Sequence, residues 1–203
     1  MTNKVLADQF GADEGLALWI RRFGMVALGV TLLWISAKVK IAIEPVPVTL
    51  QVLALMALSM AYGARMAAAT LIAYLTLGAA GEPVFAGTPE KGIGLGYMFG
   101  STGGYLLGFL ASAWVVGALS DRGWDRNVLT AAAAMAIGLV VLYIPGVLWL
   151  AYGFPITAFG AEFSGAGILK GWEWGVFPFF WIDALKLSLA AIGFPVIWKL
   201  LGR

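Results

Sequence analysis

The stretch Phe177-Pro-Phe-Phe-Trp-Ile-Asp183-Ala-Leu-Lys186-Leu-Ser-Leu-Ala-Ala191 is long and apolar, yet it carries one acidic and one basic residue. Helix positions three residues apart share a face, so Asp183 and Lys186 are expected to lie together. A charge in the middle of a membrane-spanning helix costs about 2.5–3.5 kcal/mol on insertion scales, and such residues are usually functional. Either the pair neutralises itself inside a helix bundle or it binds a polar ligand. We favour the ligand, because neutral residues would fill the bundle at a lower cost.

The whole chain has the composition of a membrane protein. Of its 203 residues, 61% are hydrophobic and only 12% are charged. This length allows about six crossings of roughly 20 residues each, joined by short loops, and leaves no room for a separate soluble domain. We therefore expect an all-α integral membrane protein with six transmembrane helices. Residues 1–22 are expected to form a cytoplasmic N-terminal segment, and residues 23–203 a single membrane domain.

The residue types that are missing exclude several function classes. The chain contains no His and no Cys, which removes the imidazole acid–base catalyst, the thiolate nucleophile and the common ligands of zinc and haem. One enzymatic alternative remains, in which Asp183 works with Glu82 or Glu162 as an acid–base pair. The net charge of +2, without a basic run, argues against nucleic acid as a partner. We expect neither enzymatic activity nor a cofactor.

Apolar stretches, and the Pro and Gly residues between them, predict where the six spans lie. The expected spans cover residues 23–43, 49–61, 66–80, 102–119, 128–152 and 176–200. A tight turn is expected between the second and third spans, and Pro145 is expected to bend the fifth. The longer loops, rich in Gly, Pro or aromatic residues, are residues 44–48, 81–103 and 153–175.

Basic residues are distributed unequally between the two ends of the predicted bundle. With a cytoplasmic N-terminus, that side receives eight of them: Lys4, Arg21, Arg22, Arg65, Arg122, Arg126, Lys199 and Arg203. The opposite side receives four: Lys38, Lys40, Lys91 and Lys170. Because cytoplasmic loops carry an excess of Lys and Arg, we expect both termini in the cytoplasm. The longer loops then lie outside, and Asp183 lies about 9 Å along the last span from the outer end.

A glycine-dense stretch, residues 87–104, precedes the fourth span. It does not fit a phosphate-binding loop, because no strand precedes it and no Lys-Ser/Thr pair follows it. Three glycines recur at a spacing of four, which allows another helix to pack closely: Gly100, Gly104 and Gly108. Three others either serve packing or expose backbone groups to a small ligand: Gly92, Gly94 and Gly96.

Three polar side chains near the expected outer ends of the helices are further candidates for ligand contacts. Tyr97 and Tyr105 combine a flat apolar ring with a hydroxyl donor. They either line a pocket or belong to the aromatic belt at the membrane surface. Gln51 follows two prolines, and it hydrogen-bonds either a ligand or the backbone that those prolines interrupt.

Four motifs in this order resemble one known family. They are Pro45-Val-Pro-Val-Thr-Leu-Gln51, Tyr74-Leu-Thr-Leu-Gly-Ala-Ala-Gly-Glu-Pro-Val-Phe-Ala86, Gly96-Tyr97-Met-Phe-Gly-Ser-Thr-Gly-Gly-Tyr-Leu-Leu-Gly-Phe109, and Pro178-Phe followed by Asp183-Ala-Leu-Lys186. Together they resemble the biotin-specific S components (BioY) of energy-coupling factor (ECF) transporters. The resemblance covers about residues 35–191.

The resemblance implies a six-helix subunit in the inner cell membrane, surrounded by lipid, that captures biotin from outside. Such subunits deliver the vitamin together with a transmembrane T component and two ATPase subunits. The family's substrate-binding positions correspond here to Asp183, Lys186, Gly96, Tyr97 and Tyr105, to which we add Gln51 and Phe85 from the first two motifs.

Biotin has a ureido ring with N–H donors and a carbonyl, and a tail that ends in a carboxylate. Asp183 is expected to accept from the ureido N–H groups, whereas Lys186 donates to the ureido oxygen or holds the carboxylate. Two alternatives stay open at this point: an S component for a different vitamin, and a structural membrane subunit without a small ligand.

Overall fold

The computed structural model describes residues 5–9, 14–153, 156–158, 161–163 and 165–201. Its α-helices are α1 (Gly15–Lys38), α2 (Gln51–Ala79), α3 (Gly94–Met98), α4 (Gly103–Ser120), α5 (Val128–Tyr152), α6 (Ile168–Gly175) and α7 (Phe177–Leu200). Two 3-10 turns are η1 (Leu6–Gln9) and η2 (Trp124–Arg126). Two antiparallel pairs join β1 (Lys40–Ile41) to β2 (Val48–Thr49) and β3 (Ile156–Ala158) to β4 (Ala161–Phe163). The fold is all-α, as expected.

Five of the helices in the described part of the chain are long and apolar enough to cross a membrane: α1, α2, α4, α5 and α7. Six spans were expected from the sequence. The difference lies in α2, which covers both the second and the third expected span as one assigned helix. The remaining long helices correspond one to one with the other expected spans.

Gly63 divides α2 into two segments at the position where the sequence predicts a turn. Its backbone is not helical, with φ of 72° and ψ of 173°. A side chain is disfavoured at this φ, and a Cβ here would also collide with the carboxylate of Asp121. That carboxylate accepts from the backbone N–H of Ala64 at 3.2 Å, as a helix N-cap does. The break in α2 is therefore a regular part of the fold, and Asp121 binds the backbone N–H of Ala64 that the break leaves without a partner inside the helix.

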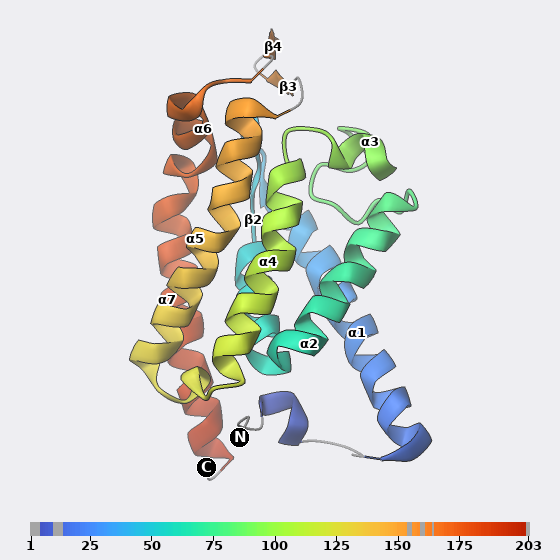
Figure 1. The fold of residues 1–203 in the computed structure, drawn as a ribbon, viewed down its shortest axis with the longest axis vertical. Coiled ribbons are helices and arrows are strands. Elements are labelled where there is room, and N and C mark those ends of the chain that lie inside the picture. The colour runs from blue at the N-terminus through green and yellow to red at the C-terminus, as the bar shows by residue number, and fades with distance from the viewer. Residues whose placement is uncertain (1–4, 10–13, 154–155, 159–160, 164, 202–203) are drawn as a thin grey trace.

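The long helices lie side by side, and α4 packs between α2 and α5 (Figure 1). Helix α1 leans against α2, while α7 packs against α5. In Figure 1, η1 and the C-terminal end of α7 lie at one end of the bundle. The short helices α3 and α6 and the β3–β4 hairpin lie at the opposite end. The predicted longer loops therefore gather at a single end.

Several element boundaries differ from the predictions. Helix α1 ends at Lys38 rather than at residue 43 and is followed by β1, and the loop expected at residues 81–103 contains α3. Helix α1 begins at Gly15 rather than at residue 23, so it runs across the proposed boundary of the membrane domain. Nothing in residues 15–23 interrupts a helix, and apolar side chains such as Leu16 continue its exposed surface. The loop expected at residues 153–175 contains α6, whose Gly171 lies close to the Val147 carbonyl of α5. The eight residues of α6 are too few for apolar periodicity to reveal this helix.

Two of the predicted close-packing glycines do lie at a helix contact. A Cβ at Gly104 would collide with the carbonyl oxygen of Pro145, and one at Gly108 with that of Leu142. Helices α4 and α5 therefore meet backbone to backbone. Gly100 precedes α4, and its carbonyl accepts from Trp149 Nε1 at 2.9 Å. The α4–α5 contact positions the side chains that both helices contribute to the site.

Candidate ligand-binding site

Asp183 and Lys186 form the ion pair that their spacing predicts. Lys186 Nζ lies 2.8 Å from Asp183 Oδ1, and Lys186 and Asp183 are 8% and 1% exposed, respectively. Both come from the first three turns of α7, a helix that begins at Phe177. The pair therefore lies near the end of the bundle that carries the longer loops.

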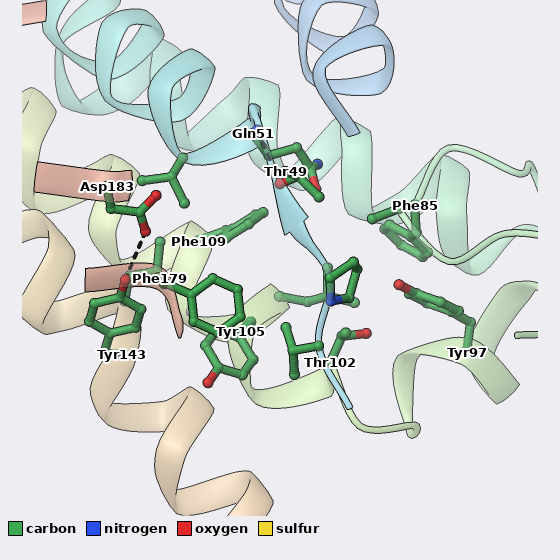
Figure 2. Close-up of a pocket in the computed structure, with 16 residues that line it drawn as sticks. Thr49, Gln51, Phe85, Tyr97, Thr102, Tyr105, Phe109, Tyr143, Phe179 and Asp183 are labelled. Atoms are coloured by element: carbon green, nitrogen blue, oxygen red, sulfur yellow. Dashed lines mark hydrogen bonds between the residues drawn. The ribbon is translucent and has the colours of Figure 1, made fainter. Parts of the chain in front are cut away.

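Each charge has a further partner from another helix or strand. Tyr143 of α5 donates its hydroxyl to Asp183 Oδ2 at 2.7 Å (Figure 2). Lys186 Nζ also donates to the carbonyl oxygen of Thr49 in β2, at 2.7 Å. Buried charges are tolerated when they are paired and hydrogen-bonded, so this network accounts for both of them. It also ties α7 to α5 and to the strand that precedes α2.

A cavity opens beside Asp183, and sixteen residues line it (Figure 2). Its empty space is about 560 Å³, counting the part open to solvent. Six of the lining residues are aromatic: Phe85, Tyr97, Tyr105, Phe109, Tyr143 and Phe179. Four others carry polar side chains: Thr49, Gln51, Thr102 and Asp183. The cavity therefore suits a ligand with a flat apolar body and a few polar groups.

At the far side of the cavity from Asp183, aromatic rings form a wall (Figure 2). Phe85 stacks on Tyr97 with ring centres 5.1 Å apart and an angle of 15° between the planes. The same Phe85 packs against Tyr74 in a T-shaped arrangement, with ring centres 5.5 Å apart and an angle of 82° between the planes. Gly78 makes room for the Phe85 ring, because a Cβ there would collide with it. The wall thus depends on a glycine of α2 and on the loop that follows that helix.

Five of the seven residues predicted for the site line this cavity: Asp183, Gln51, Phe85, Tyr97 and Tyr105. Lys186 lies directly behind Asp183 and is buried, but it is not part of the lining. Gly96 is exposed on α3 and has open space around its Cα. The structure therefore gives Gly96 no place in the cavity, because only the following residue, Tyr97, points inward (Figure 2).

The two tyrosine hydroxyls are engaged by the protein itself. Tyr105 donates to the carbonyl of Gly175 at 2.8 Å, and Tyr97 accepts from the N–H of Gly87 at 3.1 Å. Both residues are buried, so neither belongs to an aromatic belt at the membrane surface. Tyr105 lines the cavity, but its hydroxyl proton is donated to the protein, so the prediction that it donates to a ligand stays a prediction. Its hydroxyl instead joins α4 to the end of α6.

Gln51 has a protein partner that neither interpretation of the sequence included. Its Nε2 donates to the hydroxyl of Tyr74 at 2.8 Å, and that hydroxyl donates to the carbonyl of Val84 at 2.9 Å. The backbone after the two prolines is hydrogen-bonded instead by Thr49, whose Oγ1 accepts from the Gln51 N–H at 3.2 Å. Gln51 therefore links the start of α2 to the aromatic wall while it lines the cavity.

The comparisons with known proteins agree on one family. The sequence model of the BioY family matches residues 3–203. The chain belongs to the BioY family.

Relatives in the BioY family match most of the chain. A probable biotin transporter BioY from Pyrococcus horikoshii is 31% identical over 172 residues, covering 85% of this chain and 93% of the relative. A biotin transporter BioY from Thermotoga maritima is 34% identical over 161 residues, covering 79% and 86%. The crystal structure of an S-component for biotin from an ECF-type ABC transporter has a TM-score of 0.74, with 18% identity over 92% of this chain and 95% of that one. The last comparison shows a shared fold, and this BioY-family chain is a multi-pass membrane protein.

The structure adds lining residues to this BioY-family site that sequence reasoning missed. Tyr143 is the most informative of them, because it is a hydroxyl inside an apolar span, two residues before Pro145. That isolated polar group was a usable signal. No comparable signal marked Phe109 and Phe179, since aromatic residues are common throughout this chain. The Thr49 carbonyl is backbone, which no side-chain pattern reveals.

The enzymatic alternative requires Glu82 or Glu162 beside Asp183. Glu82 is exposed and is not part of the lining, and the Glu162 side chain lies outside the described residues. Within the described part of the chain, no group of three or more acidic residues is placed to hold a metal ion. The BioY family consists of transporter components, and the protein is accordingly not an enzyme.

Proposed function

We propose that this protein is the substrate-binding subunit of a vitamin-uptake transporter and that its ligand is biotin. The observation that carries the proposal is Asp183, a buried carboxylate that faces an otherwise largely apolar and aromatic cavity. Such a carboxylate accepts strong hydrogen bonds from N–H donors, and the ureido ring of biotin supplies two of them. The aromatic side chains suit the apolar body of a bicyclic ligand.

The ion pair suggests which end of biotin lies beside Asp183. Lys186 Nζ is already bonded to Asp183 Oδ1 and to the Thr49 carbonyl, and it does not line the cavity. A ligand carboxylate at this position would face the carboxylate of Asp183, and like charges repel at short range. We therefore place the ureido ring next to Asp183, with Lys186 orienting that carboxylate from behind. The acid tail then points toward the aromatic wall and the longer loops.

Direct binding tests this function. Isothermal titration of the purified protein is expected to show tight, one-to-one binding of biotin, and unlabelled biotin is expected to displace radiolabelled biotin better than other vitamins do. The reason is the pairing of one carboxylate with N–H donors in an apolar cavity, where an unpaired polar group is costly. Mass spectrometry of the small molecule that co-purifies provides an independent check. Preferential binding of another vitamin would keep the fold and reject biotin, whereas failure of all vitamins would reject the binding role.

We further propose that the chain crosses the membrane six times, with both termini in the cytoplasm. Support comes from the break at Gly63, which splits α2 into segments that correspond to two expected spans. The eight-to-four distribution of basic residues supports the orientation. The cavity then opens toward the exterior of the inner cell membrane. Delivery of the ligand would require a T component and two ATPase subunits, as the ECF type implies.

Single cysteines in this Cys-free chain test the orientation. Glu90→Cys and Arg122→Cys replace exposed residues at opposite ends of the bundle. On intact cells, a membrane-impermeant thiol reagent is expected to label the cysteine at position 90 and to leave that at position 122 unlabelled until the cells are opened. The reverse pattern would place the cavity entrance on the cytoplasmic side and reject the proposed orientation.

A further inference from the structure

The loop that follows α2 carries two lining residues of the cavity, Phe85 and Ala86. This segment is neither helix nor strand, yet each of its backbone carbonyls from residue 84 to residue 88 accepts a hydrogen bond. The carbonyl of Val84 is bound by Tyr74, and that of Gly87 by the N–H of Lys91 at 2.7 Å. The other three carbonyls are bound by lysine side chains from a distant part of the sequence, and that of Phe85 also accepts from the hydroxyl of Thr88 at 2.7 Å and from its N–H at 3.2 Å.

Lys38, the last residue of α1, binds two of these carbonyls. Its Nζ donates to the oxygen of Phe85 at 2.9 Å and to that of Thr88 at 2.8 Å, with the Thr88 hydroxyl at 3.1 Å. Lys40, two residues later in β1, donates to the oxygen of Ala86 at 2.6 Å. The nearest carboxylate to Lys40 is that of the exposed Glu90, at 3.6 Å. Backbone carbonyls of the cavity wall are thus the shortest contacts of both ammonium groups.

These contacts join α1 and β1 to the loop that carries Phe85 of the aromatic wall. Phe85 and Ala86 point their side chains at the cavity, while their carbonyl groups are held from α1 and β1. A hydrogen bond from a charged donor is shorter and about twice as strong as one between neutral groups. An irregular segment without such partners opens locally at a low free-energy cost. The two lysine side chains therefore supply hydrogen bonds of the kind that neighbouring backbone would supply in a helix or a strand.

We propose that Lys38 and Lys40 are positioning residues for the ligand. By binding the carbonyls of residues 85, 86 and 88, they hold Phe85 and Ala86 against the cavity and so set how long a ligand remains bound. This inference rests on the proposed function for its ligand, biotin. The hydrogen bonds from Lys38 and Lys40 to the wall do not depend on which ligand occupies the cavity. Lys38 and Lys40 act through the wall and do not contact the ligand.

Four variants separate this role from a general effect of charge. Lys38→Met and Lys40→Met keep an aliphatic chain and remove the cation, and Lys38→Arg restores a cation with several donors. Lys91→Met is the matched control, because Lys91 is an exposed lysine on the same loop whose Nζ lies 4.0 Å from Glu44 Oε1. It removes the same charge from the same end of the bundle without touching the wall carbonyls through its side chain.

The first measurement needs no ligand. Hydrogen–deuterium exchange of residues 84–91 in the purified protein is expected to be about tenfold faster in Lys38→Met than in the wild type, because local opening becomes less costly. Lys91→Met is expected to exchange at the wild-type rate. Unchanged exchange in both Lys38→Met and Lys40→Met would show that the wall is held without the lysines and would overturn the proposal.

The second measurement compares biotin with its neutral amide, in which the tail carries no charge. Lys38→Met is expected to raise the dissociation rate of both by at least about tenfold, because Lys38 donates charged hydrogen bonds to the carbonyls of Phe85 and Thr88, and Lys38→Arg to recover most of the loss. A loss confined to biotin would mean that the lysine contacts the tail carboxylate directly, which would overturn the positioning role. If the wild type binds no biotin, the proposed function fails. The hydrogen–deuterium exchange measurement still decides whether Lys38 and Lys40 hold the wall.

Discussion

Asp183→Asn is expected to weaken biotin binding by about ten- to 150-fold while the protein still folds and inserts. The change preserves the size of the side chain but removes its charge, and hydrogen bonds to charged groups contribute about 1.5–3 kcal/mol each. Tyr143 is still able to donate to the substituted side chain, since an amide keeps one acceptor oxygen. Isothermal titration measures the affinity, and a thermal melt in the same detergent measures the stability.

The double variant Asp183→Asn/Lys186→Met decides between a binding role and a purely structural ion pair. Removing Lys186 alone leaves a buried carboxylate unpaired, which typically costs about 3–5 kcal/mol of stability. Removing both charges relieves that cost, so the double variant is expected to melt near the wild type. Its affinity for biotin is nevertheless expected to stay low. Normal binding by the double variant would show that the pair only stabilises the bundle.

Tyr143→Phe is the matched variant for the same site. It keeps the ring that lines the cavity and deletes the hydroxyl that lies 2.7 Å from Asp183 Oδ2. One of two hydrogen bonds to the carboxylate is lost, so the expected loss of affinity is smaller than for Asp183→Asn, about three- to tenfold. A loss as large as that of Asp183→Asn would mean that Tyr143 itself binds the ligand.

The sequence predicted the ion pair at the charged end of the candidate site because charges in an apolar span have few explanations. The three-residue spacing placed Asp183 and Lys186 on one face, and the structure contains that ion pair. It did not predict what lies around the pair. Lys186 binds a backbone carbonyl of β2, 137 residues away along the chain, and a contact with a carbonyl leaves no trace in residue types.

The opposite side of the cavity was predicted less well. Lys38 and Lys40 entered the sequence argument only as two charges on the outer side, whereas the structure shows them bound to the wall that carries Phe85. These contacts depend on how α1 is placed relative to a loop nearly 50 residues further on, which local patterns do not encode. Gly96 is the converse case: its motif resembles that of the family, yet this exposed residue of α3 is not among those that line the cavity.

Helix positions followed from apolar length and from Gly and Pro residues. The predicted and observed limits of α5 coincide, and the predicted turn in α2 falls at Gly63. The start of α1 was misplaced because a helix continues beyond a membrane span wherever no residue stops it. The contact that joins α4 to α5 was predicted from glycine spacing alone. The same contact predicts a large loss of stability when one of its glycines is replaced.

Gly108→Val is expected to lower the stability of the protein by about 3 kcal/mol, the upper end of the usual cost of overpacking. The added Cβ would collide with the backbone carbonyl of Leu142, and a backbone has no alternative rotamer with which to give way. For a chain of this length, the loss corresponds to a melting temperature about 6–12 °C lower. Gly193→Ala is the matched control, because Gly193 also lies in a long helix but has open space around its Cα. That control is expected to melt at or slightly above the wild-type temperature, since Ala favours a helix over Gly.

The same variant tests whether the α4–α5 contact supports the cavity. Phe109 follows Gly108 on α4, and Tyr143 follows Leu142 on α5, and both of these neighbours line the cavity. Pushing the two helices apart at Gly108 therefore separates two walls of the site. Folded Gly108→Val protein, assayed at a temperature well below its melting point, is expected to bind biotin at least about tenfold more weakly, because groups that are displaced by even about 1 Å lose their contacts with the ligand. If Gly108→Val bound biotin with wild-type affinity and melted like the Gly193→Ala control, Gly108 would not be needed for the close approach of α4 and α5.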